Sequence, residues 1–242
     1  MPTLDCNTLV GLWPYDELDL SPQTLLAGMQ KRSISRSVIT HTTAIFYDTA
    51  SGNDACLAIA REHQPLVPCA VINPLGSPLA TLEVARCQTA GFRIFRLCPR
   101  EHGYPFSGQV GGLREVLAAL ADASLLLVDL VGLPEPCITE DIPELLPAPT
   151  VFTVRDAQLG GIFRASRSSP RVLAETSHLT GGRVLETVVR HMGPERLLFG
   201  SGAPLLSIGS AVTSIQYAEM DDATRKGVFE GNLARAMQAK TG

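Results

Sequence analysis

Positively charged and titratable side chains stand at the ends of several short apolar runs in this sequence. Arg96 and Arg155 each close such a run, and His41 and His178 follow two others. A guanidinium group binds a carboxylate or phosphate through two parallel hydrogen bonds, and an imidazole exchanges a proton near neutral pH. These residue types predict a pocket for a small anionic molecule.

Acidic and neutral polar residues stand at further run ends. The carboxylates of Asp5 and Asp129 could move protons together with an imidazole. Trp13, the only tryptophan, follows the first run, where it either covers the pocket or caps the core. The predicted catalytic residues are His178, Asp129 and Asp5, and the predicted substrate-binding residues are Arg96, Arg155, His41, Asn7, Ser177 and Trp13.

A purely structural interpretation stays open for the charged residues. An arginine at a strand end pairs with a nearby carboxylate as readily as with a ligand. His178 could bond to the backbone of its own loop. His41, which threonines flank on both sides, could satisfy the amides of a turn.

Eight short runs rich in β-branched residues alternate with longer segments of helical periodicity. The runs are Thr3–Asn7, Ser37–Thr40, Leu66–Ile72, Phe92–Leu97, Leu125–Leu130, Thr150–Val154, Val172–Glu175 and Leu197–Phe199. An open doubly wound sheet would carry a glycine-rich phosphate-binding turn after its first strand, where Gly11 stands alone. The pattern therefore predicts an α/β fold, a single (β/α)8 TIM barrel over residues 1–242, with its site at the C-terminal ends of the strands.

Helix start signals support this arrangement. Ser21 and Ser77 each precede a proline, which predicts an N-cap followed by proline in the first turn. After Ser77, Leu79 and Leu82 recur with Val84 at roughly helical spacing, so we expect these side chains to face the sheet.

Four motifs carry a resemblance to a known family. Residues 196–204 read R-L-L-F-G-S-G-A-P, close to a last-strand R-L-L-F-G-S-D-x-P, and residues 91–99 match a fourth-strand G-x-x-x-x-R-L-x-P. Glu175 to Ser177 is similar to a D-x-S, and residues 231–235 to a closing G-N-A-x-R. The chain thus resembles the amidohydrolase superfamily, specifically its amidohydrolase-related (β/α)8 hydrolases and decarboxylases. The resemblance implies a metal-dependent-hydrolase-like barrel.

The same resemblance implies metal ligands that this sequence lacks. The first strand of the family reads D-x-H-x-H, and here Asn7 and Leu9 hold the histidine positions. Asp129 stands for the fifth-strand histidine and Gly202 for the eighth-strand aspartate. Zinc or manganese requires imidazole and carboxylate ligands around an open position. We therefore expect no metal and no cofactor.

Composition narrows the partners. The net charge is −4, and lysine and arginine form no basic run, which argues against nucleic acid. No apolar run is long enough for a membrane span or a signal peptide, and the six cysteines form no C-x-x-C pair, so we expect a cytoplasmic protein. Val228, Phe229 and Met237 either form a homo-oligomer interface or pack on the barrel.

Two functions follow from these observations. The first is a metal-independent hydrolase of a small carboxylate or lactone, bound at the C-terminal face of the barrel. The alternative is a non-catalytic pseudoenzyme that acts as a ligand-binding or partner subunit. The two differ in whether a bound ligand is turned over.

Overall fold

The computed structural model describes residues 3–135 and 137–238, and its strands form one curled sheet. The order of the strands is β2-β1-β3-β4-β5-β6-β7-β8-β9, and every neighbouring pair is parallel except β1 and β2. The strands are β1 (Thr3–Leu12), β2 (Asp19–Leu20), β3 (Ile34–His41), β4 (Leu66–Val71), β5 (Ile94–Leu97), β6 (Leu125–Asp129), β7 (Thr150–Thr153), β8 (Val172–Glu175) and β9 (Leu197–Leu198).

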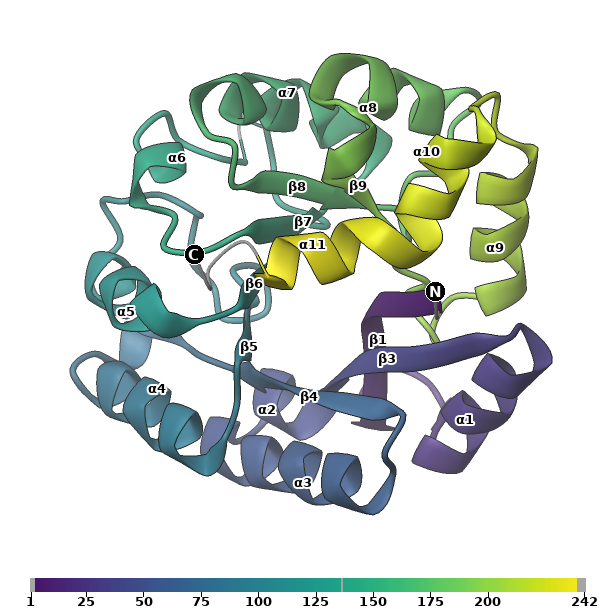
Figure 1. The fold of residues 1–242 in the computed structure, drawn as a ribbon. Helices are drawn as coiled ribbons and strands as arrows, with labels where there is room; N and C mark the ends of the chain where they lie inside the picture. Colours follow the sequence, from purple (N-terminus) through teal and green to yellow (C-terminus); the bar gives the residue numbers. More distant parts are fainter. Residues whose placement is uncertain (1–2, 136, 239–242) are drawn as a thin grey trace.

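Helices surround the sheet, as Figure 1 shows. They are α1 (Pro22–Lys31), α2 (Thr42–Phe46), α3 (Thr49–Glu62), α4 (Leu79–Ala90), α5 (Leu113–Ala119), α6 (Ile142–Leu145), α7 (Leu159–Ser168), α8 (Val184–Met192), α9 (Ile208–Tyr217), α10 (Asp222–Lys226) and α11 (Asn232–Gln238). A π-helical turn, Gly227–Gly231, joins the last two.

Backbone hydrogen bonds between β1 and the segment around β9 close the sheet. The amide of Cys6 donates to the carbonyl of Phe199 at 2.9 Å, and Leu9 donates to Ala203 at 2.8 Å. The result is an α/β barrel-like fold. Each of the eight predicted strands overlaps an observed one, but the described residues contain nine strands, because the antiparallel β2 was not predicted.

Two apolar layers hold the barrel together. The inner layer fills the barrel between the strands, with members such as Cys6, Ile94 and Leu125. The outer layer lies between the strands and the surrounding helices. Leu233 belongs to the inner layer, and Figure 1 shows its helix α11 lying across one end of the barrel. The first residues of the strands point to this end, so α11 seals it and leaves the opposite end for a site.

The helix start signals were right for α1 and wrong for α4. The hydroxyl of Ser21 accepts a hydrogen bond from the amide of Thr24 at 3.2 Å. In α4 the N-cap is Pro78 and no side chain caps it. Val84 is buried as predicted, but Leu79 and Leu82 are 70% and 64% exposed, because the helix turns Ala80 and Cys87 toward the sheet together with Val84.

Three apolar residues, Val228, Phe229 and Met237, were predicted to form either an oligomer interface or a contact with the barrel. They pack on the barrel. Val228 is 1% exposed, and Phe229 and Met237 lie against the two apolar layers. All six cysteines are buried and free. In the part of the chain that the structure describes, no helix has the length and apolar character needed to cross a membrane.

Candidate functional site

A cavity of about 330 Å³ opens at the C-terminal ends of the strands, opposite α11. Its walls combine an apolar part with a cluster of charged groups. The polar lining residues are Asn7, Arg96, Arg100, Glu101, Asp129, Arg155 and His178. The apolar ones are Leu9, Trp13, Leu18, Ile45, Phe46, Val131, Leu205 and Leu206, together with Cys98 and Gly202.

A chain of hydrogen bonds across the barrel forms the floor of this cavity. Arg96 donates from Nη2 to Oδ1 of Asn7 at 2.6 Å. The amide nitrogen of Asn7 donates to Oε1 of Glu175 at 3.1 Å and to Oγ of Ser177 at 3.3 Å. Ser177 in turn donates to Oε1 of Glu175 at 2.6 Å. The strands β1, β5 and β8 are therefore linked through one asparagine in the middle of β1.

Arg96 is the most confined of the cationic groups. The residue is 3% exposed, and its Nε has no hydrogen-bond partner. Among the described residues, neither Arg96 nor Arg155 forms an ion pair with a carboxylate. The alternative interpretation from the sequence, in which each arginine forms a structural ion pair with a nearby carboxylate, is therefore not what the structure shows for these two residues.

Asp5 lies beneath the cavity and does not line it. Its Oδ1 accepts hydrogen bonds from the amides of Asn7 at 3.1 Å and Ser201 at 3.0 Å, whereas its Oδ2 has no partner. Burial raises the pKa of Asp5 to about 7, and the hydrogen bonds from Ser201 and Asn7 oppose this rise. Asp5 is thus placed to position β1 and the loop after β9 and is out of reach of a ligand.

Asp129 faces the cavity from the end of β6. Its Oδ1 accepts from the amide of Val131 at 3.0 Å. Burial raises the pKa of Asp129, and the positive charge of Arg96, the Val131 amide and His178 lower it in turn. The carboxylate is therefore desolvated but surrounded by groups that stabilise its charged form.

Arg100 and Glu101 line the cavity from the loop after β5, and the sequence prediction missed both. Their side chains approach each other to 3.9 Å, where Arg100 is 57% and Glu101 19% exposed. The signal was present, since both directly follow the strand-end Pro99. Because Arg100 and Glu101 follow Arg96 by only a few residues, they lie in the loop that forms part of the cavity wall.

An aromatic cluster forms the rim. Trp13, Tyr15 and Phe46 contact one another edge to face, with ring centroids 5.3 to 5.7 Å apart. Trp13 and Phe46 line the cavity, while Tyr15 is 74% exposed. The tryptophan therefore lies at the cavity wall, and one side of the opening is aromatic.

The structure brings most of the predicted site residues to one place. Asn7, Trp13, Arg96, Asp129, Arg155 and His178 line the cavity. Ser177 lies behind Asn7. His41 lies outside the lining, because its Nδ1 accepts from the amide of Thr43 at 3.2 Å and caps α2. Burial lowers the pKa of His41, which fits this neutral acceptor role.

Cys98 also lines the cavity, yet its thiol is not activated. Burial raises its pKa well above the usual value, and the charge of Arg96 offsets this only in part. Because the thiolate is the nucleophilic form, Cys98 contributes a small apolar surface.

The donors around the cavity do not fit the divalent metal that the resemblance implies. The side chain of Leu9 has no donor atom, and the amide of Asn7 is taken by Arg96, Glu175 and Ser177. At Gly202, φ is +68°, and an added Cβ would lie 2.9 Å from Leu206 and 3.2 Å from Ser177. Among the described residues, no three His, Cys, Asp or Glu side chains are grouped to hold a metal ion.

Comparison with known families gives one match over most of the chain. The sequence profile of the amidohydrolase family matches residues 8–237. No curated protein sequence matches significantly.

Solved structures similar to this one share its fold at low sequence identity. An uncharacterized TIM-barrel protein from Bordetella bronchiseptica has a TM-score of 0.76 at 13% identity, covering 98% of both chains. The 2,6-dihydroxybenzoate decarboxylase from Rhizobium has a TM-score of 0.73 at 14%, covering 100% of this chain and 99% of the other. A putative 2-pyrone-4,6-dicarboxylic acid hydrolase from Pseudomonas putida has a TM-score of 0.68 at 18%, covering 98% and 97%.

Proposed function

The chain belongs to the amidohydrolase family, and from this premise we propose that it hydrolyses an ester or lactone bond of a small organic carboxylate without a metal ion. The barrel is then a (β/α)8 barrel with one added strand, β2. The reaction takes place in the cavity at the C-terminal ends of the strands, which is where barrels of this type carry their sites.

The observation that carries the proposal is the state of Arg96. Its guanidinium is buried, lines the cavity, forms no ion pair with a carboxylate among the described residues and keeps an unsatisfied Nε. Asp129 and Glu175 act on this charge without forming an ion pair with it, and a buried donor without an acceptor costs free energy. A carboxylate bound in the cavity places a further negative charge beside this guanidinium.

The other walls suit the rest of such a molecule. Leu9, Trp13 and Phe46 offer apolar and aromatic surface to its carbon skeleton, and Arg155 adds a second guanidinium at the exposed side of the cavity. The similar structures named for a dihydroxybenzoate and a pyrone dicarboxylic acid support a carboxylate as the ligand class.

Residues of this chain supply the chemistry. Asp129, with His178 beside it, takes a proton from the attacking water. Arg96 stabilises the negative charge that develops on the carbonyl oxygen. An activated ester or a lactone reacts by this route, because a positioned base and a cationic donor replace the need for a metal hydroxide.

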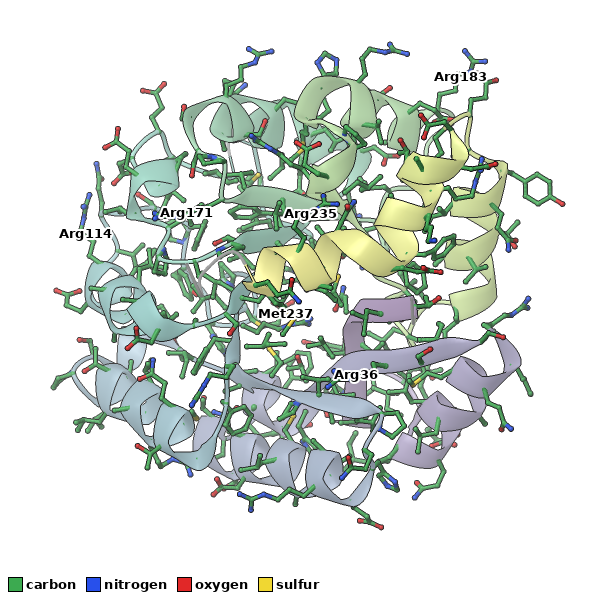
Figure 2. All side chains as sticks on the ribbon, in the orientation of Figure 1. Arg36, Arg114, Arg171, Arg183, Arg235 and Met237 are labelled. Atoms are coloured by element: carbon green, nitrogen blue, oxygen red, sulfur yellow. The ribbon has the colours of Figure 1, made fainter. Side chains whose placement is uncertain are left out.

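The test uses 2-pyrone-4,6-dicarboxylate, a lactone with two carboxylates, and follows the loss of its ring absorbance. We expect turnover that persists after treatment with a chelator and dialysis. Arg155→Gln should raise KM about tenfold or more, since a charge-assisted hydrogen bond contributes roughly 1.5 to 3 kcal/mol. Arg36→Gln is the matched control, because Arg36, which Figure 2 labels on β3, is exposed and does not line the cavity.

A second candidate function is ligand binding without catalysis. Leu9 and Gly202 favour it, because they leave two of the cavity positions without reactive atoms. Calorimetric binding of the dicarboxylate with no loss of ring absorbance would select this function. Absence of both binding and turnover would contradict both candidates for this ligand class.

A further inference from the structure

Glu101 and Asp129 bring two carboxyl groups into one small cavity. Glu101 comes from the loop after β5, and Asp129 from the end of the neighbouring β6. The backbone of Glu101 faces solvent, but its side chain is turned inward and only 19% exposed. The two acids therefore share a confined space of about 330 Å³.

The groups that face Glu101 do not neutralise it. Arg100 approaches its carboxylate only to 3.9 Å and is 57% exposed, so solvent weakens this attraction. Tyr104 and Cys98 lie nearby as neutral groups whose pKa values burial raises well above their usual values. Burial and then the charge of Asp129 raise the pKa of Glu101, while Arg100 and Arg96 lower it by less.

Asp129 is better supported as an anion. Arg96 is the largest influence that lowers its pKa, followed by the amide of Val131 and by His178. The Asp129 carboxylate accepts from the amide of Val131 at 3.0 Å. Like charges in one desolvated site repel each other, so a proton goes first to the carboxyl group with the weaker hydrogen-bond support. That group is Glu101. The unsatisfied Nε of Arg96, in a side chain 3% exposed, points independently to a ligand in the same cavity.

We propose that Glu101 and Asp129 form a proton-sharing pair in which Glu101 is the acid that protonates the leaving oxygen of the substrate and Asp129 is the base. This assignment rests on the proposed hydrolysis. Glu101 would thus be a catalytic residue.

The step is balanced. The oxygen of water forms a bond to the carbonyl carbon as its proton passes to the carboxylate of Asp129. The bond from that carbon to the leaving oxygen then breaks, and the carboxylic proton of Glu101 passes to this oxygen. The products are an acid and an alcohol, and the proton on Asp129 returns to Glu101 to restore the pair.

The first experiment needs no ligand. The side-chain carboxyl carbons of the full chain are followed by ¹³C NMR as a function of pH. We expect Asp129→Asn to lower the titration midpoint of Glu101 by on the order of one pH unit, because Glu101 then loses its proton without an anion beside it. Glu101→Gln should leave the midpoint of Asp129 nearly unchanged, because Glu101 is still neutral when Asp129 titrates. Glu17→Gln is the control, because Glu17 is exposed outside the cavity. A Glu101 midpoint that does not respond to Asp129→Asn would overturn the pair, and an Asp129 midpoint that falls in Glu101→Gln would reverse the assignment of acid and base.

The second experiment assigns the donor. The phenyl and 4-nitrophenyl half-esters of glutaric acid carry the same carboxylate but differ in their leaving groups. Phenolate is more basic than 4-nitrophenolate and therefore depends more on a proton from an acid. Glu101→Gln should slow the phenyl ester about 100-fold and the nitrophenyl ester much less. Equal losses on both esters would overturn the donor role. If the unmodified chain hydrolyses neither ester nor the pyrone lactone, the proposed hydrolysis fails and the donor role with it, whereas the titration still decides whether the pair exists.

Discussion

At the scale of single residues, one asparagine explains how the cavity floor is organised. Asn7 accepts from Arg96 with its oxygen and donates to Glu175 and Ser177 with its nitrogen. A histidine at this position has no pair of a carbonyl oxygen and an amino group to satisfy both neighbours at once. With asparagine in place of histidine, position 7 therefore binds the buried guanidinium of Arg96, whereas the family resemblance implies a metal ligand at this position.

Asp5 provides a prediction on stability. Its pKa in the folded chain is raised from 3.8 to about 7, so the protonated form is favoured by folding. The stabilisation is fully present below pH 3.8 and is lost as pH rises through about 7. Between pH 5 and pH 8, Asp5 should lower the free energy of unfolding by about 2 to 3 kcal/mol.

Urea unfolding at the two pH values measures this effect. Asp5→Asn keeps the acceptor for the amides of Asn7 and Ser201, and it should remove that part of the pH dependence. Asp122→Asn is the control, because Asp122 is exposed at the end of the short 3-10 helix Leu120–Asp122 that follows α5. Equal pH dependence in Asp5→Asn and the unsubstituted chain would show that Asp5 is ionised in the folded state.

The sequence predicted a cavity residue correctly where its position along a strand alone determines whether it reaches the cavity. Arg96, Asp129, Arg155 and His178 line the cavity because each stands at or close to the end of a strand, whereas Asn7 lines it from the middle of β1, which continues to Leu12. Side-chain direction is not encoded in this way. Ser177 turns behind the floor, and His41 caps a helix whose start was not predicted.

At the scale of elements, strands were easier to predict than helix faces. A barrel strand is buried on both sides, so its apolar run shows directly in the sequence. In α4 the leucines are exposed and small residues face the sheet, as Ala80 and Cys87 do, because close packing leaves little room there. Hydrophobicity alone therefore placed Val84 correctly and the two leucines wrongly. The short β2 was missed since its two residues form no pattern.

The loop after β9 makes an element-scale prediction. A Cβ at Gly200 would collide with Oε2 of Glu175 and lie 3.2 Å from Cβ of Asn7. Gly200→Ala should therefore displace the cavity floor, lower the free energy of unfolding by about 1 to 3 kcal/mol and weaken binding of the pyrone dicarboxylate.

Thermal unfolding and calorimetric titration measure the two effects. Gly182→Ala is the matched control, because a Cβ there meets no atom within 4 Å. If Gly200→Ala bound the ligand as tightly as Gly182→Ala does, the floor would not need its present arrangement.

At the scale of the whole molecule, the two ends of the barrel have separate tasks. The cavity occupies the end where the strands finish, and α11 covers the end where they begin. Only the location of the cavity could be predicted from the sequence, because sites in such barrels lie at the C-terminal ends of the strands. The sealing role of α11 depends on contacts between residues far apart in the chain, such as Leu233 with Cys6, which a local pattern does not reveal.

This division predicts that stability and ligand binding separate. Leu233 is 2% exposed and packs into the interior of the barrel from α11, at the end opposite the cavity. Leu233→Ala should lower the free energy of unfolding by about 2 to 5 kcal/mol, because it removes buried methyl groups and leaves a void. Arg235→Ala, on the same helix and exposed, should change it by no more than about 0.5 kcal/mol. In calorimetry below the unfolding transition, both variants should bind the dicarboxylate as the unsubstituted chain does, since no cavity residue is moved. Weaker binding by folded Leu233→Ala than by Arg235→Ala would mean that packing at the sealed end sets the geometry of the cavity.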